Sequence, residues 1–339
     1  MSYAFLSCFK PLTSFEEVEP RWLFDRRLPE GQIILIASDG GSGKTTVAVE
    51  LIAAISSGRT CFLDPPETQR EPALTAFLST EDSVSQKLKR KLRLAGADMD
   101  RVLCPDFSAE NSEELRRFKF GSGLMADFVA HYQPKLVVYD PLQGFIPPDV
   151  NMGSRNAMRD CLAPLVSLGE KYGTTFLILC HSNKRQHASG RDRIADSADL
   201  WDIARSVLMI GYTNEPGQRY LSHEKSNYGE LQETILFQIQ DERVVPDGYT
   251  WKRDREFQEE NGSQNSAPKR NDCKEWIIGT LAANGGILKA RELDDLSKMD
   301  GYSAKTIRTA KNELKSEGKI YYKAEGFTDK VWYIHLAAS

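Results

Sequence analysis

The sequence predicts an α/β protein whose main domain contains a doubly wound, mostly parallel β-sheet, followed by a smaller second domain. Short apolar segments alternate with helical patterns as far as about residue 245. Two of these segments, LVVY at 136–139 and FLILC at 176–180, are apolar throughout, which is typical of strands that helices cover on both faces. A strongly polar stretch then separates this region from a shorter C-terminal one.

The elements of the main domain follow in order from this alternation. We expect strands at 32–37, 73–79, 101–104, 135–140, 174–180, 205–210, 219–225 and 234–240. We expect helices at 45–56, 82–95, 112–133 and 154–172. The domain is predicted to span residues 1–250, with its core at about 20–245.

A polar linker is predicted at residues 251–270. Within it, DREFQEENGSQNSAPKR at 254–270 contains one aromatic residue and no aliphatic residue except Ala267, so it is too polar to bury. After the linker, residues 271–339 show three helical patterns and then two short strands, at 319–323 and 331–336. That order favours a winged helix-turn-helix domain.

Composition excludes several classes of protein. The 339 residues carry 44 basic and 48 acidic side chains, a net charge of −4, which excludes a uniformly basic nucleic-acid coat but allows a local basic patch. The six cysteines are far apart and form no CxxC pair, so we expect reduced thiols rather than disulfides or zinc ligands. No apolar run approaches the roughly 18 residues of a membrane span, and the N-terminus lacks the features of a signal peptide. We therefore expect a cytoplasmic protein with no membrane partner.

A glycine-rich loop joins the strand at 32–37 to the helix at 45–56. This phosphate loop comprises Ser38, Asp39, Gly40, Gly41, Ser42, Gly43, Lys44, Thr45 and Thr46. In such a loop the backbone N–H groups and the helix N-terminus bind phosphate oxygens, the lysine reaches the β- and γ-phosphates, and the Thr45 hydroxyl ligates Mg²⁺. A chance Gly-Lys-Thr would lack the preceding strand, the extra glycines and the following helix. The loop thus predicts binding of ATP and Mg²⁺, although Ser38 stands where the usual pattern has glycine.

Polar residues follow three other predicted strands. Asp140 ends the strand LVVYD and could hold Mg²⁺, the alternative being an Asp-Pro turn. Glu81 follows the strand at 74–79 and could polarise an attacking water, whereas it could also only supply negative charge to a helix N-terminus. His181 follows the strand at 176–180 and could sense a γ-phosphate, the alternative being a structural histidine.

Taken in order, these motifs resemble the RecA-like ATPases related to the hexameric plasmid replicative helicase RepA. The resemblance covers roughly residues 20–240. It includes the phosphate loop, FLSTED (77–82), VVYDPLQGF (137–145), DVNM followed by Asn and Arg (149–159), LILCHSNK (177–184), ARSVLM (204–209) and EKSNYG (224–229).

The resemblance implies a RecA-type core that works as a ring or filament with nucleotide between neighbouring subunits. It also implies a role for each site residue of the core. Lys44 and Thr45 bind phosphate and Mg²⁺, Asp140 completes the metal site, Glu81 is the base and His181 is the sensor.

Two further cations are implied to act across the subunit interface. Arg205 occupies the position of an arginine supplied in trans, where a guanidinium neutralises charge on the neighbour's nucleotide. Lys225 is a second candidate, and the alternative for both is a surface cation at a strand end. Members of the family often carry Gly-Ser shortly before this arginine, whereas this chain has Asp196-Ser197.

The resemblance also places a basic loop in the central channel of a ring. The segment 184–193 has four cations, Lys184, Arg185, Arg191 and Arg193, against one acid. Repeated around a ring, it would bind the phosphates of single-stranded DNA with strong salt dependence. The alternative is an ordinary solvated loop.

A second basic surface is predicted on the C-terminal helix at 303–317. Its cations form one stripe and its apolar residues form another, roughly 120° apart. The cations are Lys305, Arg308, Lys311 and Lys315, and the apolar residues are Ile307, Ala310 and Leu314. Such a helix could pack on its domain and contact duplex DNA, the alternatives being a solvated face or a protein-docking surface.

The leading hypothesis is an oligomeric, most simply hexameric, ATPase that acts on DNA as a helicase or motor in the replication or recombination of a mobile element. A second hypothesis is a DNA-bound regulator or loader that ATP controls without unwinding. A small-molecule kinase is a third, disfavoured because no arginine-rich lid is evident.

Overall fold

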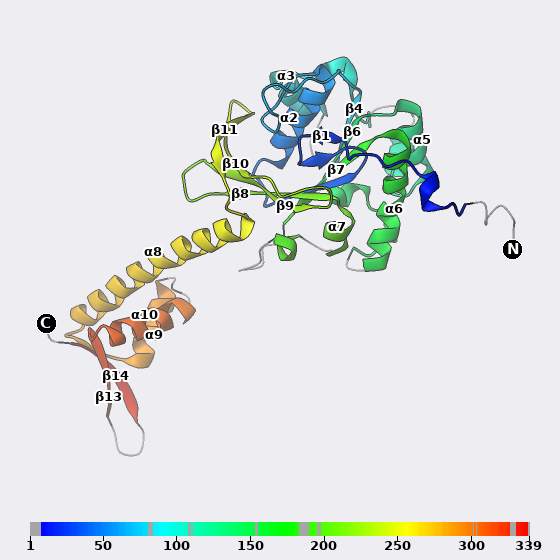
Figure 1. Cartoon of the computed structure of the whole chain (residues 1–339). Coiled ribbons are helices and arrows are strands. Elements are labelled where there is room, and N and C mark those ends of the chain that lie inside the picture. Colours follow the sequence, from blue (N-terminus) through cyan, green and yellow to red (C-terminus); the bar gives the residue numbers. More distant parts are fainter. Residues whose placement is uncertain are drawn as a thin grey trace. The chain divides into compact units, whose positions relative to one another are not determined.

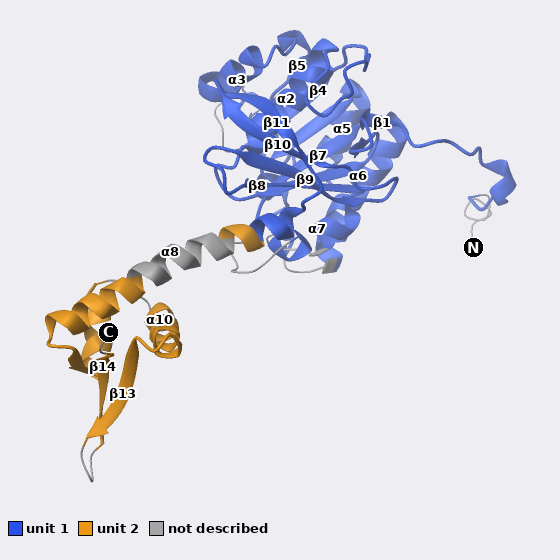
Figure 2. Cartoon of the chain, turned by 60° about the vertical axis from the view of Figure 1, so that its left-hand side comes forward, with its two compact units in different colours: residues 1–258 blue, residues 259–339 orange. Residues whose placement is uncertain are grey.

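The structure, a computed structural model, describes residues 8–80, 84–107, 110, 112–152, 155–182, 190–194, 198–300, 302, 304–325 and 330–337. The chain divides into two compact units, residues 1–258 and 259–339 (Figure 2). The boundary falls inside the segment predicted as a polar linker.

The first unit is an α/β domain in which strands and helices alternate (Figure 1). Its strands are β1 (Trp22–Phe24), β2 (Leu28–Pro29), β3 (Ile33–Ser38), β4 (Thr75–Ser79), β5 (Val102–Leu103), β6 (Leu136–Asp140), β7 (Thr175–His181), β8 (Ser206–Tyr212), β9 (Arg219–Ser226), β10 (Thr234–Gln240) and β11 (Arg243–Thr250). Its helices are α2 (Lys44–Ser57), α3 (Lys89–Leu94), α4 (Ser112–Arg116), α5 (Gly123–Tyr132), α6 (Arg155–Tyr172), α7 (Ala198–Ile203) and the start of α8 (Asp254–Ala283). Short helical segments are η1 (Leu12–Ser14), η2 (Val84–Leu88), η3 (Met99–Arg101), η4 (Leu142–Phe145) and η5 (Gly190–Arg193).

Within the described residues, nine strands form the main sheet in the order β11-β10-β9-β8-β3-β7-β6-β4-β5. Neighbours from β8 to β5 run parallel, and β9, β10 and β11 add to β8 as an antiparallel extension. The sequence-based prediction of a doubly wound, mostly parallel sheet is therefore confirmed.

Both faces of the sheet are buried, as the fully apolar strands predicted. Along β3, Ile34 and Ile36 join one core cluster with α2, while Ile33 and Leu35 join a second cluster with α6. Successive side chains of a strand point to opposite faces, so helices on each side are needed to bury both sets. This arrangement makes the sheet a rigid platform for the loops at its edge.

The predicted helix at 112–133 was wrong, because the structure divides it into α4 and α5. Between them lies a turn in which Gly121 has φ +73°, a left-handed conformation, and the Ser122 hydroxyl caps the N-terminus of α5 by accepting from the Met125 N–H. The apolar residues on either side share a helical spacing, so periodicity did not reveal the break.

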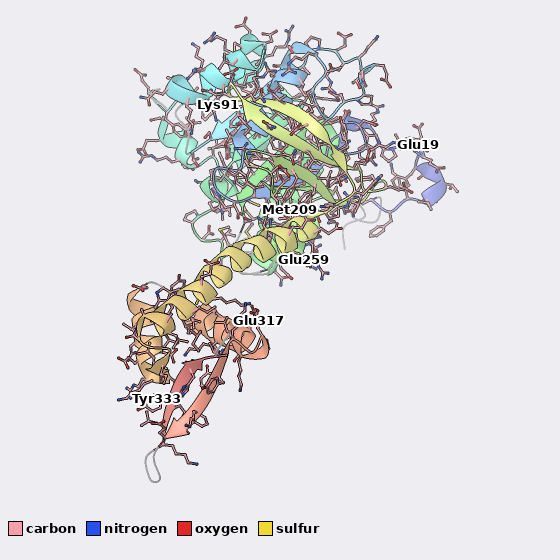
Figure 3. The ribbon with its side chains drawn as sticks, turned by 90° about the vertical axis from the view of Figure 1, so that its left-hand side faces the viewer. Glu19, Lys91, Met209, Glu259, Glu317 and Tyr333 are labelled. Carbon is pink, nitrogen blue, oxygen red and sulfur yellow. The ribbon has the colours of Figure 1, made fainter. Side chains whose placement is uncertain are left out.

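The second unit contains the rest of α8, then β12 (Ile287–Lys289), α9 (Ala290–Met299), α10 (Ala304–Ser316), β13 (Ile320–Glu325) and β14 (Val331–Leu336). Its three strands are antiparallel in the order β12-β14-β13. Buried side chains such as Ile277, Leu293 and Ile334 give the unit its own core. Figure 3 labels Glu317 and Tyr333 in this unit. Neither β12 nor the helical conformation of the polar segment 254–270 was predicted from the sequence.

Among the helices of the described residues, none combines the length and the hydropathy that spanning a membrane requires.

Candidate nucleotide site

Four parallel strands bring the predicted site residues to one edge of the sheet. Ser38, at the end of β3, is in register with His181, at the end of β7. Asp140, at the end of β6, is in register with Ser79, at the end of β4. The carboxyl ends of parallel strands meet at one edge, so residues far apart in the sequence converge there.

The glycine-rich loop curls between β3 and α2. Gly41 and Gly43 have φ values of +78° and +108°, which L-residues with a Cβ rarely adopt. At Gly43 an added Cβ would also lie 2.7 Å from the Cδ1 atom of Ile239 on β10. The helix α2 begins at Lys44, so its N-terminal N–H groups and dipole face the loop.

The ammonium group of Lys44 lies at the mouth of this loop. Its Nζ donates to the Ser38 carbonyl at 3.1 Å, to the Ser38 hydroxyl at 3.0 Å and to the Asp39 carbonyl at 3.3 Å. His181 Nδ1 lies 3.3 Å from the same Nζ. The structure therefore brings the predicted phosphate-binding lysine and the predicted sensor histidine into direct contact.

Ser38 shows why a serine serves where the usual pattern has glycine. Its side chain is fully buried, and its hydroxyl lies 2.5 Å from the Ser42 hydroxyl while accepting from Lys44. Ser42 also donates to the Asp39 carbonyl at 2.8 Å. These hydrogen bonds connect the loop to the end of β3, so serine in place of glycine at position 38 adds contacts to the site. No signal in the sequence pointed to this role.

Thr45 and Asp140 meet as the predicted metal site requires. The Thr45 hydroxyl donates to Asp140 Oδ2 at 2.8 Å, and Asp140 is buried at 6% exposure. Mg²⁺ in phosphate-binding sites is held through one or two protein oxygens, water and phosphate, so a paired hydroxyl and carboxylate beside a phosphate loop fit that ion. Thr46 is buried one position further along α2.

Glu81, the predicted base, lies outside the described residues. Its position in the chain follows Thr80, whose backbone N–H donates to the Asp140 carbonyl at 3.1 Å. The strand that leads to Glu81 therefore ends beside the strand that carries Asp140.

Tyr212 and Arg219, which were not predicted from the sequence, lie along one side of the phosphate loop. Tyr212, half exposed at the end of β8, donates its hydroxyl hydrogen to the Gly41 carbonyl at 2.9 Å. The guanidinium of Arg219 on β9 lies 5.1 Å from the Tyr212 ring centroid, a cation–π contact. Tyr212 comes from β8, which runs parallel to β3, and Arg219 comes from the antiparallel β9. Neither residue belongs to a phosphate-binding motif, so only the fold reveals them.

Arg205 lies at the opposite edge of the sheet from its own phosphate loop. Its backbone N–H donates to the carbonyl of Ile33, at the start of β3, which is five residue steps or roughly 17 Å before Ser38. Its Nε is buried and has no hydrogen-bond partner among the described residues. A role at the nucleotide of the same subunit is therefore ruled out by this geometry, and a role in trans stays a prediction.

Lys225, the second predicted trans contact, holds the end of α7. Its ammonium donates to the carbonyls of Trp201, Asp202 and Ala204 at 2.7, 3.1 and 2.7 Å. Burial lowers the pKa of this ammonium, and the positive charges of Arg205 and Arg191 act in the same direction. Lys225 would have to release these carbonyls before it could contact a neighbouring subunit.

The basic loop predicted to bind DNA is described only in part. Lys184 and Arg185 lie outside the described residues. Arg191 is exposed and pairs with Asp202 at 2.6 Å. For Arg193 the prediction of a DNA contact is corrected, because the side chain is 3% exposed and pairs with Asp39 and with Asp254. A buried guanidinium between two carboxylates presents no charge to a phosphate in solution.

The cations of α10 also divide into two groups. Arg308 and Lys315 are exposed, as predicted, and the side chain of Lys305 lies outside the described part of the chain. For Lys311 the prediction of a DNA contact is corrected, because the residue is buried at 7% exposure and pairs with Asp294 of α9. The apolar stripe is buried as expected, with Ile307, Ala310 and Leu314 all in the core of the second unit.

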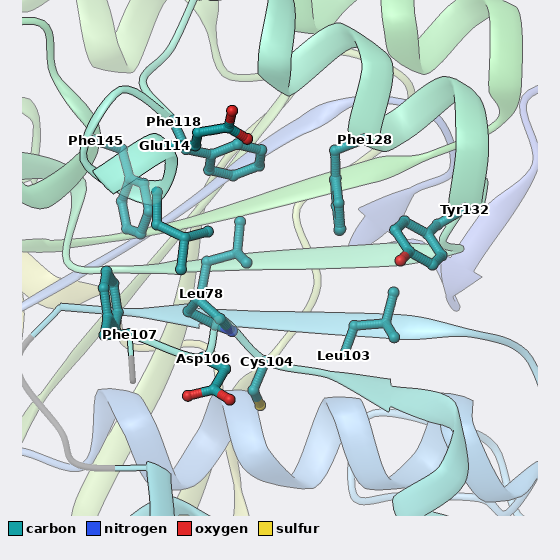
Figure 4. A pocket seen from close by; sticks show the side chains of 12 residues that line it. Leu78, Leu103, Cys104, Asp106, Phe107, Glu114, Phe118, Phe128, Tyr132 and Phe145 are labelled. Carbon is teal, nitrogen blue, oxygen red and sulfur yellow. The ribbon is translucent and has the colours of Figure 1, made fainter. Parts of the chain in front are cut away.

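An apolar cavity of about 370 Å³ lies at the β4–β5 edge of the sheet (Figure 4). Its lining includes Leu103, Phe118 and Phe128, with Asp106 and Glu114 among its few charged groups. In the sheet, β7, β6 and β4 separate β5 from the strand that carries the phosphate loop. Aromatic and aliphatic walls favour apolar groups over phosphates, so this cavity is not a second phosphate site.

The chain resembles several curated proteins over most of its length. It is 23% identical over 247 residues to the DNA repair protein RadA of Bacillus subtilis, a match that covers 69% of this chain and 47% of that protein. It is 22% identical over 217 residues to the RadA protein of Streptococcus pneumoniae, covering 63% and 44%. The chain thus spans about half the length of these relatives.

Two solved structures were also matched. The flagellar accessory protein FlaH of Methanocaldococcus jannaschii is 12% identical, with a TM-score of 0.45, over 65% of this chain and 91% of that one. A KaiC-like protein of Pyrococcus horikoshii is 17% identical, also with a TM-score of 0.45, over 69% of this chain and 99% of that one.

The family comparison agrees with the site geometry. The AAA domain family matches residues 11–187, just over half of the 339 residues. This range contains the phosphate loop, Asp140 and His181. The chain therefore belongs to the AAA domain family, and its first unit has a RecA-like P-loop ATPase core.

Proposed function

We propose that the protein is a Mg²⁺-dependent ATPase that is stimulated by DNA and works as a ring-shaped oligomer, most simply a hexamer, in the cytoplasm. The observation that carries the proposal is the contact of Lys44 with His181, and of Thr45 with Asp140, at the edge where the phosphate loop opens. The RadA relatives, named as DNA repair proteins, support the link to DNA.

Each side chain of the site has a distinct task in this proposal. The loop N–H groups and Lys44 hold the β- and γ-phosphates, and Thr45 and Asp140 hold Mg²⁺, which when bound neutralises charge that develops on the phosphates. Glu81 orients the attacking water, and His181, in contact with Lys44, responds to the presence of the γ-phosphate. Arg205 of a neighbouring subunit supplies a further positive charge, so that hydrolysis depends on assembly.

A helicase or motor role in replication or recombination of a mobile element is the finer form of the proposal. Its test is ATP turnover with and without single-stranded DNA, together with displacement of one strand from a forked duplex. We expect turnover to rise with the single strand, and this stimulation to weaken between about 50 and 200 mM salt. Stimulation without displacement would reject the helicase role. Turnover that no nucleic acid changes would favour an ATP-controlled regulator or loader instead.

For the second unit we propose a winged helix-turn-helix domain over residues 271–339, joined to an ATPase domain over 1–250 by the segment 251–270. The proposal is supported by the order of its elements, in which α9 and α10 are followed by the antiparallel pair of β13 and β14. The exposed cations Arg308 and Lys315 on α10 are then the candidate DNA contacts.

Replacing Arg308 or Lys315 by alanine is expected to weaken duplex binding and to reduce the slope of log affinity against log salt by about one per substitution. Lys274→Ala is the matched control, since it removes the same charge from a lysine whose ammonium already pairs with Glu313 and Glu317. Fluorescence anisotropy at several salt concentrations measures the slopes. Equal slopes for wild type, Arg308→Ala and Lys315→Ala would show that α10 does not bind DNA.

A further inference from the structure

A buried polar network connects the phosphate loop to the first turn of α8. Its centre is Arg193, at the end of η5, whose side chain is 3% exposed. One guanidinium nitrogen, Nη2, donates to Asp39 Oδ2 in the phosphate loop at 3.1 Å. The other, Nη1, donates to Asp254, the first residue of α8, which is fully buried. The two nitrogens of one planar group thus bridge two segments 215 positions apart in the chain.

The phosphate-loop end of the bridge is held by a second contact. The Ser182 hydroxyl, one residue after β7, donates to Asp39 Oδ1, and the Ser182 backbone N–H donates to the Ser38 carbonyl at 2.9 Å. Asp39 is 44% exposed at its side chain, and the backbone carbonyl of the same residue accepts from Lys44 at 3.3 Å. A change in the conformation of the phosphate loop is therefore transmitted to Arg193 through a single residue, Asp39.

The α8 end of the bridge is also held by several groups. Asp254 Oδ2 accepts from the Gly190 N–H at 3.1 Å, and Asp254 Oδ1 accepts from the Tyr220 hydroxyl at 2.7 Å. The Asp254 N–H itself donates to Glu224 Oε1 at 2.9 Å. Burial, and then the charge of Asp254, raise the pKa of Tyr220, so its hydroxyl keeps the proton that it donates. Both ends of η5 are thus attached to the start of α8.

We propose that Arg193 is a positioning residue that couples occupancy of the phosphate loop to the placement of η5 and of the first turn of α8. The proposal rests on the nucleotide site proposed above. Phosphates bound by the loop restrain Asp39, Asp39 restrains Arg193, and Arg193 restrains Asp254. Because such coupling is reciprocal, the network also sets nucleotide affinity.

Two amides of the network report on it directly, those of Gly190 and Asp254, because each donates to a carboxylate of the cluster. Their hydrogen exchange is measured with and without Mg²⁺ and a non-hydrolysable ATP analogue. Nucleotide binding is measured separately by titration of a fluorescent analogue. In the wild type we expect the analogue to slow exchange at both amides by about fivefold or more.

Arg193→Lys is the decisive variant. It keeps a positive charge beside Asp254, so no buried carboxylate is left uncompensated, but a single ammonium cannot bridge both carboxylates as the guanidinium does. We expect the variant to bind the analogue more weakly, and the slowing of exchange at Gly190 and Asp254 to fall below about twofold. Arg70→Lys is the matched control, because Arg70 pairs with the buried Asp64 at 2.5 Å elsewhere in the first unit. It should respond as the wild type does.

Asp254→Asn provides a second route if Arg193→Lys does not fold. It loosens the α8 end of the bridge while Arg193 keeps Asp39 as its partner, and it should weaken nucleotide binding about fivefold although Asp254 touches no part of the phosphate loop. If the wild type binds the analogue but hydrogen exchange at Gly190 and Asp254 does not change, the proposed coupling is overturned while the proposed function stands. The coupling is also overturned if the analogue slows exchange in Arg193→Lys as much as in the wild type, or if Asp254→Asn binds nucleotide with unchanged affinity. A wild type that binds no nucleotide would instead overturn the proposed function.

Discussion

Replacing Lys44 by alanine is expected to lower ATP turnover by about 10²–10³-fold. The ammonium of Lys44 is the cation that lies at the opening of the phosphate loop, held there by the Ser38 and Asp39 carbonyls. Its removal takes away a preorganised positive charge where negative charge develops during phosphoryl transfer. Steady-state turnover at saturating Mg²⁺ and ATP measures the effect.

Lys89→Ala is a suitable control for this variant, because Lys89 is an exposed lysine of α3 in the same unit. It should turn over ATP as the wild type does, and thermal melting should show that Lys44→Ala is folded. Normal turnover in folded Lys44→Ala would remove the phosphate-loop assignment and, with it, the proposed ATPase.

Replacing Arg205 by alanine is expected to lower turnover of the assembled protein by about 10³-fold or more. The reason is that an arginine supplied across an interface neutralises charge in the transition state, and Arg205 lies too far from its own phosphate loop to act there. Its buried Nε has no hydrogen-bond partner among the described residues, so the guanidinium keeps donor capacity for an incoming group. The residual turnover per subunit of the variant should not depend on protein concentration. The turnover per subunit of the wild type should rise with concentration, because it depends on assembly.

Mixing tests whether the effect crosses an interface. Glu81→Gln should bind ATP and turn it over poorly, because the residue proposed to orient water has lost its charge. When Arg205→Ala and Glu81→Gln proteins are mixed, some interfaces pair an intact Glu81 with an intact Arg205, so part of the activity should return. Absence of rescue in a mixture whose assembly is verified by size measurement would refute a trans role for Arg205.

Most of the first unit was predictable because its signals are local. A strand buried on both faces needs apolar residues at every position, and β6 and β7 carry such runs in the sequence itself. The signal for the phosphate loop is equally local, because the glycines of the turn directly precede the helix that begins at Lys44. The break between α4 and α5 was less visible, because it consists of a short turn that contains Gly121 and of the Ser122 cap that follows it.

The candidate site was predictable in its residues but not in all its contacts. Parallel strands align their carboxyl ends, so the polar residues that follow them were expected to meet, and Lys44, His181, Thr45 and Asp140 do so. Tyr212 was not predicted, because it reaches Gly41 from the end of β8, beyond the ARSVLM motif of that strand. The role of Glu81 stays a prediction.

The sequence by itself determined the fold class, the phosphate loop and the strand ends that surround it, because each is encoded by residues adjacent in the chain. Only the tertiary structure decided which cations are available to a ligand. Arg193 and Lys311 look like their exposed neighbours in the sequence, yet each is buried against a carboxylate from another element. Arg193 is 154 residues from Asp39 and 61 from Asp254, and pairing at such separations depends on how the sheet brings its loops together.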